Sequence, residues 1–275
     1  MINTVHIKAK LREVFTVDTP RTTPEEVILI VGSCRSVAYL NYLEFYNRTH
    51  GHPFRIHFID PFDHNWDEHG NRVDFEQAIN ARETDPRLGA VLKSTSIYIH
   101  EFYKHFGMFN SSETAEKNIF QFGLKPKLNI CIPNFNDLFI LFNDLVKFDP
   151  DVRTAAFAGG PRESIIAAGQ PKGMAAVEKF YSVCRQSSFP EMEEKFRDTW
   201  KKLRYFWTSN HVSSHFTLFV FAQMVNKFLR LDLNESFWGT VRDWDMFKNP
   251  HTGITEYDRQ AYGLEWAEPD VALSI

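Results

Sequence analysis

Short apolar runs alternate with amphipathic segments along the first half of the chain. The apolar runs are rich in β-branched residues, as expected of buried parallel strands, and they cover residues 27–31, 54–59, 96–100 and 128–132. The segments between and after them carry apolar and aromatic residues at helical spacing, at 35–47, 73–82, 112–122 and 137–147. Strands that alternate with helices of this size predict an α/β fold, with a doubly wound parallel sheet over about residues 25–150.

The chain beyond about residue 160 has a helical pattern. After Pro190, five apolar residues share one face of an expected helix: Met192, Phe196, Trp200, Leu203 and Trp207. Ser213 or Ser214 is expected to cap a following helix that runs to about Arg230.

The tail from Leu231 shows no clear periodicity, yet its aromatic residues predict an ordered segment, because a disordered one would carry few of them. We find no repeat, low-complexity tract or obvious linker. We therefore expect one composite domain over 1–275, in which a helical portion at about 151–275 packs on the sheet portion.

The strongest chemical signal follows the first apolar run, where the chain reads Gly32-Ser33-Cys34-Arg35. A strand that ends here and opens a helix would put the Cys34 sulfur, or the Ser33 hydroxyl, at a helix N-terminus. Backbone N–H groups and the helix dipole lower a thiol pKa at such a place and stabilise an oxyanion. The alternative is a turn that only packs the strand against the helix.

Two further segments could contribute to the same chemistry. Asn134 follows the fourth apolar run, where its amide could donate to an oxyanion or hold a substrate carbonyl; a turn that caps the next helix is the alternative. His211 precedes the expected helix cap and His215 lies one turn into that helix. A neutral imidazole there could act as general base to a thiol or hydroxyl, although a lone loop histidine is more often structural.

A metal site and a phosphate loop are both disfavoured. Four potential ligands follow the second apolar run, namely Asp60, Asp63, His64 and His69. Their spacing matches no recognised zinc or calcium pattern, so we favour a turn whose acids cap or line a crevice, and we expect no metal. No glycine-rich phosphate loop is present, which argues against nucleotide-dependent hydride or phosphoryl transfer.

Composition and charge indicate which partners and which cellular compartment to expect. The net charge of −4 and the absence of a Lys/Arg stripe argue against nucleic-acid binding. The three cysteines, Cys34, Cys131 and Cys184, are odd in number and far apart, which favours free thiols in a reducing, cytoplasmic compartment. We expect no secretory signal and no membrane span, because the first ten residues lack an apolar core and no 18-residue apolar run occurs.

Three short motifs occur in the right order to resemble the WcbI-type polysaccharide biosynthesis family, whose members carry G-N-C-Q-like, P-N and N-H-P-S/T segments. In this chain they are the residues 32–35, 132–135 and 209–213, within a resemblance that spans roughly 25–235. Two positions depart from the pattern: Ser33 stands where Asn is usual, and Val212 replaces the Pro after the His.

The resemblance implies a distant relationship to SGNH-type hydrolases, binding of coenzyme A, and acetylation of sugars. By position, Cys34 would be the reactive residue, Asn134 the oxyanion or substrate contact, and His211 the base. On this basis we expect an enzyme that moves an acetyl group from acetyl-CoA to a hydroxyl or amino group of a sugar or nucleotide sugar.

On the donor side, the expected contacts with coenzyme A are Gly32, Ser33, Arg35, Arg153 and Arg162, the three arginines meeting its phosphates. The runner-up function is an SGNH-like carbohydrate esterase or thioesterase that uses the same turn. A sugar- or nucleotide-binding protein with an inert Cys34 is the third reading.

Overall fold

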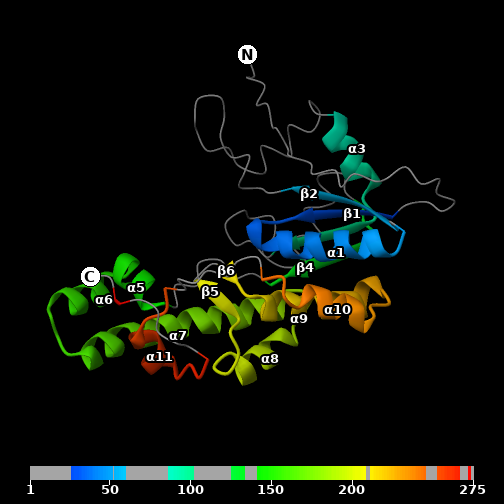
Figure 1. Cartoon of the computed structure of the whole chain (residues 1–275). Coiled ribbons are helices and arrows are strands. Elements are labelled where there is room, and N and C mark those ends of the chain that lie inside the picture. The colour runs from blue at the N-terminus through cyan, green and yellow to red at the C-terminus, as the bar shows by residue number, and fades with distance from the viewer. Residues whose placement is uncertain are drawn as a thin grey trace, which may run out of the picture. The chain divides into compact units, whose positions relative to one another are not determined.

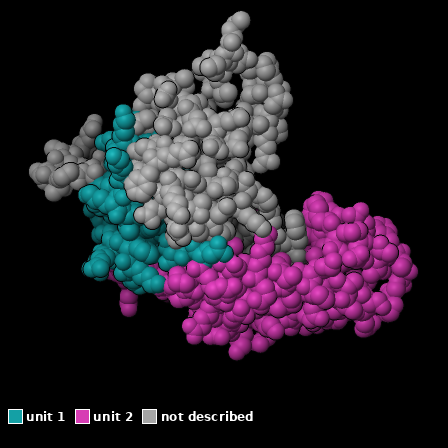
Figure 2. Space-filling model, turned by 180° about the vertical axis from the view of Figure 1, so that it is seen from behind, with its two compact units in different colours: residues 1–132, 186–188, 224–232 teal, residues 133–185, 189–223, 233–275 magenta. Residues whose placement is uncertain are grey.

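The computed structural model describes residues 26–51, 53–59, 86–101, 125–133, 141–208, 211–245, 253–266 and 272–273. The chain divides into two compact units, which Figure 2 distinguishes by colour. Unit 1 comprises residues 1–132, 186–188 and 224–232, and unit 2 comprises the remainder. Each unit is described separately below.

Unit 1 is built on a parallel sheet of four strands (Figure 1), which makes the fold α/β. Its strands are β1 (Glu26–Val31), β2 (Phe54–Ile59), β3 (Ile97–Glu101) and β4 (Leu128–Ile132). They lie in the order β2-β1-β3-β4, so the two middle strands are β1 and β3. All four strands were predicted from their apolar runs: β2 and β4 have the predicted bounds, β1 begins one residue earlier, and β3 is displaced by one residue.

Strand β3 begins and ends one residue later than its apolar run. Ser96, the predicted first residue, precedes the strand, and its side-chain oxygen lies 3.1 Å from both the backbone N and the carbonyl O of Val27. The Ser96 backbone N–H also donates to the Val27 carbonyl at 2.9 Å, so Ser96 is bonded to β1 although it precedes β3. The strand then continues for one residue beyond its apolar run, to Glu101.

The core of unit 1 forms around the middle strands. Ile28 is paired with Ile56 on one side and Ile97 on the other, and all three are buried. Strands buried on both faces need near-continuous apolar sequences, which explains why the predictions from sequence succeeded here. The outer edge of β4 is also covered: the Ser188 N–H donates to the carbonyl of Cys131, and the Cys131 N–H donates to the Ser188 hydroxyl.

The expected helix after β1 is present. It opens with the 3₁₀ helix η1 (Cys34–Ser36) and continues as α1 (Val37–Thr49), which lies in front of the sheet in Figure 1. Another helix, α3 (Pro86–Ser94), precedes β3. The helices predicted at 73–82 and 112–122 lie outside the described residues.

Unit 2 is mainly helical. Its helices are α5 (Phe142–Phe148), α6 (Pro150–Phe157), α7 (Arg162–Gln186), α8 (Met192–Thr199), α9 (Ser214–Met224), α10 (Glu235–Val241) and α11 (Glu256–Tyr262); the last residues of α7 and α9 are grouped with unit 1. Strands β5 (Phe206–Thr208) and β6 (His211–Val212) form an antiparallel pair. The helix predicted at 137–147 corresponds, over its described part, to α5. Among the described helices, none combines the length and apolar character that crossing a bilayer requires.

The helix predicted after Pro190 is shorter than expected. Met192, Phe196 and Trp200 are buried as predicted, but α8 ends at Thr199. Leu203 is 36% exposed, and Trp207 belongs to strand β5. The spacing of these two residues imitates a helical face, whereas the backbone leaves the helix through a turn closed by the N–H groups of residues 202 and 203 on the Thr199 carbonyl.

The helix predicted to end near Arg230 does so, with a change of type. After α9 the backbone widens into the π-helix η3 (Val225–Leu229), and Arg230 ends it in the left-handed region with φ 50°. The tail, in which no periodicity was visible, contains α10 and α11. Asn234 and Thr255 cap these helices, and their side chains accept hydrogen bonds from the backbone of Phe237 and Asp258.

Helix α7 packs closely against its neighbours through two glycines one turn apart. A Cβ on Gly169 would lie 2.5 Å from the Phe142 ring, and a Cβ on Gly173 would lie 1.8 Å from the Tyr262 hydroxyl oxygen. Both sites therefore accept only glycine without rearrangement, because ordinary side chains cannot approach so closely.

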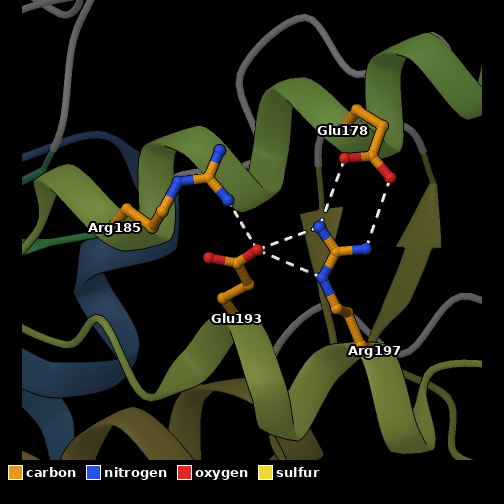
Figure 3. A network of polar contacts seen from close by, with 4 residues as sticks. All are labelled: Glu178, Arg185, Glu193 and Arg197. Atoms are coloured by element: carbon orange, nitrogen blue, oxygen red, sulfur yellow. Dashed lines mark hydrogen bonds and ion pairs between the residues drawn. The ribbon is translucent and has the colours of Figure 1, made fainter.

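A polar network joins α7 to α8 (Figure 3). The Glu193 carboxylate forms ion pairs with Arg185 at 2.5 Å and with Arg197 at 2.9 Å. Arg197 forms a further ion pair with Glu178 at 3.2 Å. The Arg197 guanidinium lies 3.6 Å from the centre of the Tyr181 ring. Because these groups are partly solvated, the network contributes modestly to stability and mainly fixes how α8 lies along α7.

Candidate functional site

The candidate site is the turn Gly32–Ser36 at the carboxyl end of β1. Strand β1 is followed by β2 on one side, while β3 lies on its other side and β4 lies beyond β3. The order of the strands therefore reverses its direction between β1 and β3. Open α/β sheets bind ligands at such a reversal, outside the carboxyl ends of the strands.

Glu101, the last residue of β3, holds this turn. Its side chain is only 2% exposed. The carboxylate oxygen Oε1 accepts from the Ser33 backbone N–H at 3.1 Å and from the Ser36 hydroxyl at 2.5 Å. The Ser33 hydroxyl lies 3.2 Å from both carboxylate oxygens, so it donates to the same group. The guanidinium of Arg35 adds an ion pair, with Nε 3.6 Å from Oε2.

These contacts shape the start of α1. The Ser36 N–H donates to the Ser33 carbonyl at 2.9 Å, and the Arg35 N–H donates to the Ser33 hydroxyl at 3.3 Å. Ser36 occupies the position that caps α1, but its side chain makes no capping bond because its hydroxyl is directed to Glu101. The turn is thus tied to a neighbouring strand rather than to its own helix.

Gly32 is what allows this approach. A Cβ at this position would lie 2.1 Å from the Ser36 side-chain oxygen and 2.9 Å from Glu101 Oε1. Any side chain would therefore displace the hydroxyl or the carboxylate. The glycine expected to contact coenzyme A has, at the least, a structural reason to be here.

Four of the predicted site residues come together at this turn: Gly32, Ser33, Cys34 and Arg35. Ser33 is 5% exposed and bonded to Glu101, which argues against its hydroxyl as the nucleophile. The backbone of Cys34 begins η1, at the start of the helical segment, whereas its side chain lies outside what the structure describes. Arg35, expected to meet a phosphate, is buried and paired with Glu101.

The other predicted arginines belong to unit 2. Arg153 donates to the carbonyls of Lys147 at 2.8 Å and Val146 at 3.3 Å, an arrangement that satisfies the end of α5. The Arg162 guanidinium lies 5.4 Å from the centre of the Tyr257 ring. Both residues are exposed.

His211 also belongs to unit 2, where it is half-buried in β6 and paired with Thr208 of β5. Cys34 lies in unit 1, so the pairing of these two residues in one reaction remains a prediction. Asn134 lies outside the described residues, as do Asp60, Asp63, His64 and His69. Among the residues that the structure does describe, no three His, Cys, Asp or Glu side chains gather as metal ligands.

The segment after His211 is anchored on both sides. The Ser213 carbonyl accepts from the N–H groups of Phe216 and Thr217 in the first turn of α9. Ser213 thus holds the position predicted for the cap, and its hydroxyl donates to the carbonyl of Arg204. Asp245 accepts from the Trp207 indole N–H at 2.8 Å and from the Ser214 hydroxyl at 3.3 Å. Asp245 thereby links the β5–β6 pair to the start of α9.

The thiols of Cys131 and Cys184 and the imidazole of His100 are all uncharged at neutral pH. Burial raises the pKa of the Cys131 and Cys184 thiols well above the usual value, so neither forms a thiolate at neutral pH. Burial likewise lowers the pKa of His100 to about 4, against a weaker opposing effect of its hydrogen bonds. His100 is therefore neutral at pH 7, stacked on Tyr98 with 5.0 Å between ring centres.

The role of Glu101 was not predicted from the sequence. Its only local signal is an acid directly after an apolar run, in Ile97-Tyr98-Ile99-His100-Glu101. An acid at that position reaches the turn after β1 only because β3 lies beside β1. The order of elements along the chain does not fix which strands are neighbours. Asp245 was missed for the same reason, since it lies 31 residues from the Ser214 hydroxyl that it accepts.

No protein-family model matches this chain, and neither a curated protein nor a solved structure does. The resemblance to the WcbI-type family therefore rests on the three short motifs alone.

Proposed function

We propose that this chain is an acyltransferase that moves an acetyl group from acetyl-CoA to a hydroxyl or amino group of a sugar or nucleotide sugar. The observation that supports the proposal most is the turn around Cys34, which begins a helical segment at the carboxyl end of β1 and is held from the next strand by Glu101. A rigid turn at a helix start suits acyl transfer, because a thiolate and an oxyanion are both stabilised there.

In the proposed reaction the Cys34 thiolate attacks the thioester carbonyl. A new carbon–sulfur bond forms, the bond to coenzyme A breaks, and coenzyme A leaves as a thiolate that takes up a proton. The acceptor oxygen or nitrogen then attacks the acyl carbon, His211 takes its proton, and Cys34 departs as a thiolate. Backbone N–H groups of the turn, with Asn134, hold the oxyanion. A direct transfer, in which Cys34 only positions the thioester, would give the same products.

The proposal includes the finer architecture. The strand order β2-β1-β3-β4 supports a doubly wound sheet, because right-handed crossovers that run in opposite directions put helices on opposite faces. We propose that the chain forms one composite domain. Acetyl-CoA as donor accords with a cytoplasmic location, and a sugar acceptor with no nucleic-acid partner.

The geometry changes which arginines we propose as contacts for the phosphates of coenzyme A. Arg35 shares its charge with Glu101, and a buried ion-paired guanidinium has less to offer a phosphate than a solvated one. Arg153 and Arg162, which are exposed, are then the stronger proposals for these contacts.

The test is a thiol-release assay. The protein is incubated with acetyl-CoA, with and without a panel of sugars and nucleotide sugars, and free coenzyme A thiol is measured. We expect multiple-turnover release that depends on an acceptor, retained in Cys184→Ala and lost in Cys34→Ala. Continued release without any acceptor, beyond the one equivalent that acylates Cys34, would make the protein a thioesterase, and no release under any condition would leave only a binding role.

A further inference from the structure

We infer that Glu101 is the positioning residue for Cys34: its carboxylate fixes the turn on which the proposed nucleophile sits. The inference rests on the proposed function for its catalytic consequence, but its structural part can be tested separately. Glu101 is not proposed to touch the substrate.

The register of the sheet explains why this residue reaches the turn. Val31 is paired with His100 across β1 and β3, so the next residues along, Gly32 and Glu101, face each other where both strands end. Parallel pairing fixes the height of Glu101, and the missing side chain of Gly32 lets its carboxylate approach. Both ends of the contact are therefore set by the sheet.

The two carboxylate oxygens share the Ser33 hydroxyl and differ in their other partners. Oε1 receives the Ser33 N–H and the Ser36 hydroxyl, which lie on either side of Cys34 and Arg35. Oε2 faces the Arg35 guanidinium. One carboxylate thus holds both ends of a four-residue turn and balances the charge of a residue within it. Since a buried charge without a partner is costly, the turn, the acid and the arginine form one unit.

This arrangement matters for catalysis because reacting groups must be held to within a fraction of an ångström. A misplacement of about 1 Å in an active site can lower the rate by about 100-fold. Loosening the turn would move the residue 34 backbone and the N–H groups around it together. We therefore expect Glu101 to act on kcat more than on the KM for acetyl-CoA.

The variant Glu101→Gln distinguishes the roles of the two carboxylate oxygens. The glutamine carbonyl can still accept at the Oε1 position, but its NH₂ replaces Oε2 and faces the Arg35 guanidinium, where a donor meets a donor. The negative charge that faces Arg35 in the wild type is then lost, which favours a thiolate at Cys34. We expect the pH midpoint of Cys34 alkylation by iodoacetamide to fall while kcat for acetyl transfer drops by about 100-fold. The double variant Arg35→Gln/Glu101→Gln, which restores neutrality, should return the midpoint toward that of the wild type.

Asp258→Asn is the matched control. Asp258 is also a buried acid that accepts backbone N–H groups, those of Phe142 and Thr255, but it lies in unit 2. Its replacement should lower the melting temperature and leave the Cys34 alkylation profile unchanged. A general loss of packing would affect both variants alike, and a positioning role affects only Glu101→Gln.

The outcomes are distinguishable. A folded Glu101→Gln protein with the wild-type alkylation midpoint overturns the inference, whether or not the wild type transfers acetyl groups. A shifted midpoint in a protein whose wild type shows no transfer supports the positioning of Cys34 and overturns the proposed function alone. If Glu101→Gln does not fold, Ser36→Ala decides the matter, because it removes one hydroxyl from the carboxylate: a wild-type alkylation midpoint and rate in that variant contradict the inference, and a change in either supports it.

Discussion

The Ser36 hydroxyl lies 2.5 Å from the Glu101 carboxylate, so the residue that would ordinarily cap α1 is instead bonded to the end of β3. This contact joins two segments 65 residues apart in the sequence. It also explains how a turn of small residues keeps one conformation at the edge of the sheet. Cys34 lies within that turn, and its reactivity is the first consequence to test.

Cys34 should be alkylated selectively. The buried Cys131 and Cys184 thiols have raised pKa values and are not thiolates at neutral pH, whereas a cysteine at a helix start is stabilised as a thiolate. Peptide mapping after brief exposure to iodoacetamide should find the label on Cys34 first. The three cysteines should react alike in denaturant, and a Cys34 that reacts no faster in the native protein than in the denatured one would remove the main support for a nucleophile.

His211→Ala should lower kcat by about 10²–10⁴-fold, which is the usual contribution of a general base. His215→Ala is the matched control, because His215 is exposed in the same segment and four residues further along. Steady-state kinetics with acetyl-CoA and an active acceptor would compare the two, with circular dichroism to confirm that both variants fold. Full activity in His211→Ala would exclude this residue as the base.

Two glycine substitutions should change stability in opposite directions. Gly173→Ala in α7 would drive a methyl group to within 1.8 Å of the Tyr262 hydroxyl oxygen, and overpacking of this kind costs about 1–3 kcal/mol. Gly239→Ala in α10 meets nothing within 4 Å and should stabilise the protein by up to about 1 kcal/mol through helix propensity. Urea unfolding of both variants would measure the difference, and equal effects would contradict the close approach of α7 and α11.

Stability should decrease as the pH falls from about 6.5 to about 4 through the contribution of His100. The folded-state pKa of His100 is lowered to about 4 from 6.5 by burial, so within this window the unfolded chain binds the proton and the folded chain does not. The contribution is on the order of 3 kcal/mol across the window. Asp258 acts in the opposite sense, because burial raises its pKa from 3.8 to about 6.

The difference between variants therefore isolates His100 better than the wild-type slope does. His100→Gln removes the titrating ring, and its free energy of unfolding should fall less than that of the wild type between pH 6.5 and pH 4.5. Identical pH dependence in the two proteins would show that His100 remains able to bind a proton in the folded state.

Much of the sheet was predictable from the sequence, and the network at its edge was not. Runs such as Val27-Ile28-Leu29-Ile30-Val31 can be read directly, because a strand buried on both faces must be apolar throughout. The turn after β1 could be recognised for a related reason, since glycine and small polar residues follow that run. Local patterns failed where a helix and a strand fit the same spacing of apolar residues. Trp207 follows Trp200 at a helical spacing, but it belongs to strand β5.

The role of Glu101 shows the other limit of sequence reasoning. Its partners Ser33 and Ser36 lie on another strand–helix connection, and only the order β2-β1-β3-β4 brings them to it. The same holds for Arg35, whose charge suggested a phosphate contact until its pairing with Glu101 was visible. Long-range polar contacts of this kind leave almost no trace in a single sequence.

The measurement that tests the central claim most directly is calorimetric titration of the protein with coenzyme A, alongside its melting temperature. A ligand present at about 100 times its dissociation constant stabilises the folded state by about 2.7 kcal/mol, which for a chain of this size raises the melting temperature by about 5 °C. We predict such a shift with coenzyme A, a smaller one with ADP, and weakening of both by salt, since the phosphates meet arginines. Absence of any heat of binding at millimolar coenzyme A and acetyl-CoA would contradict the account and favour an esterase.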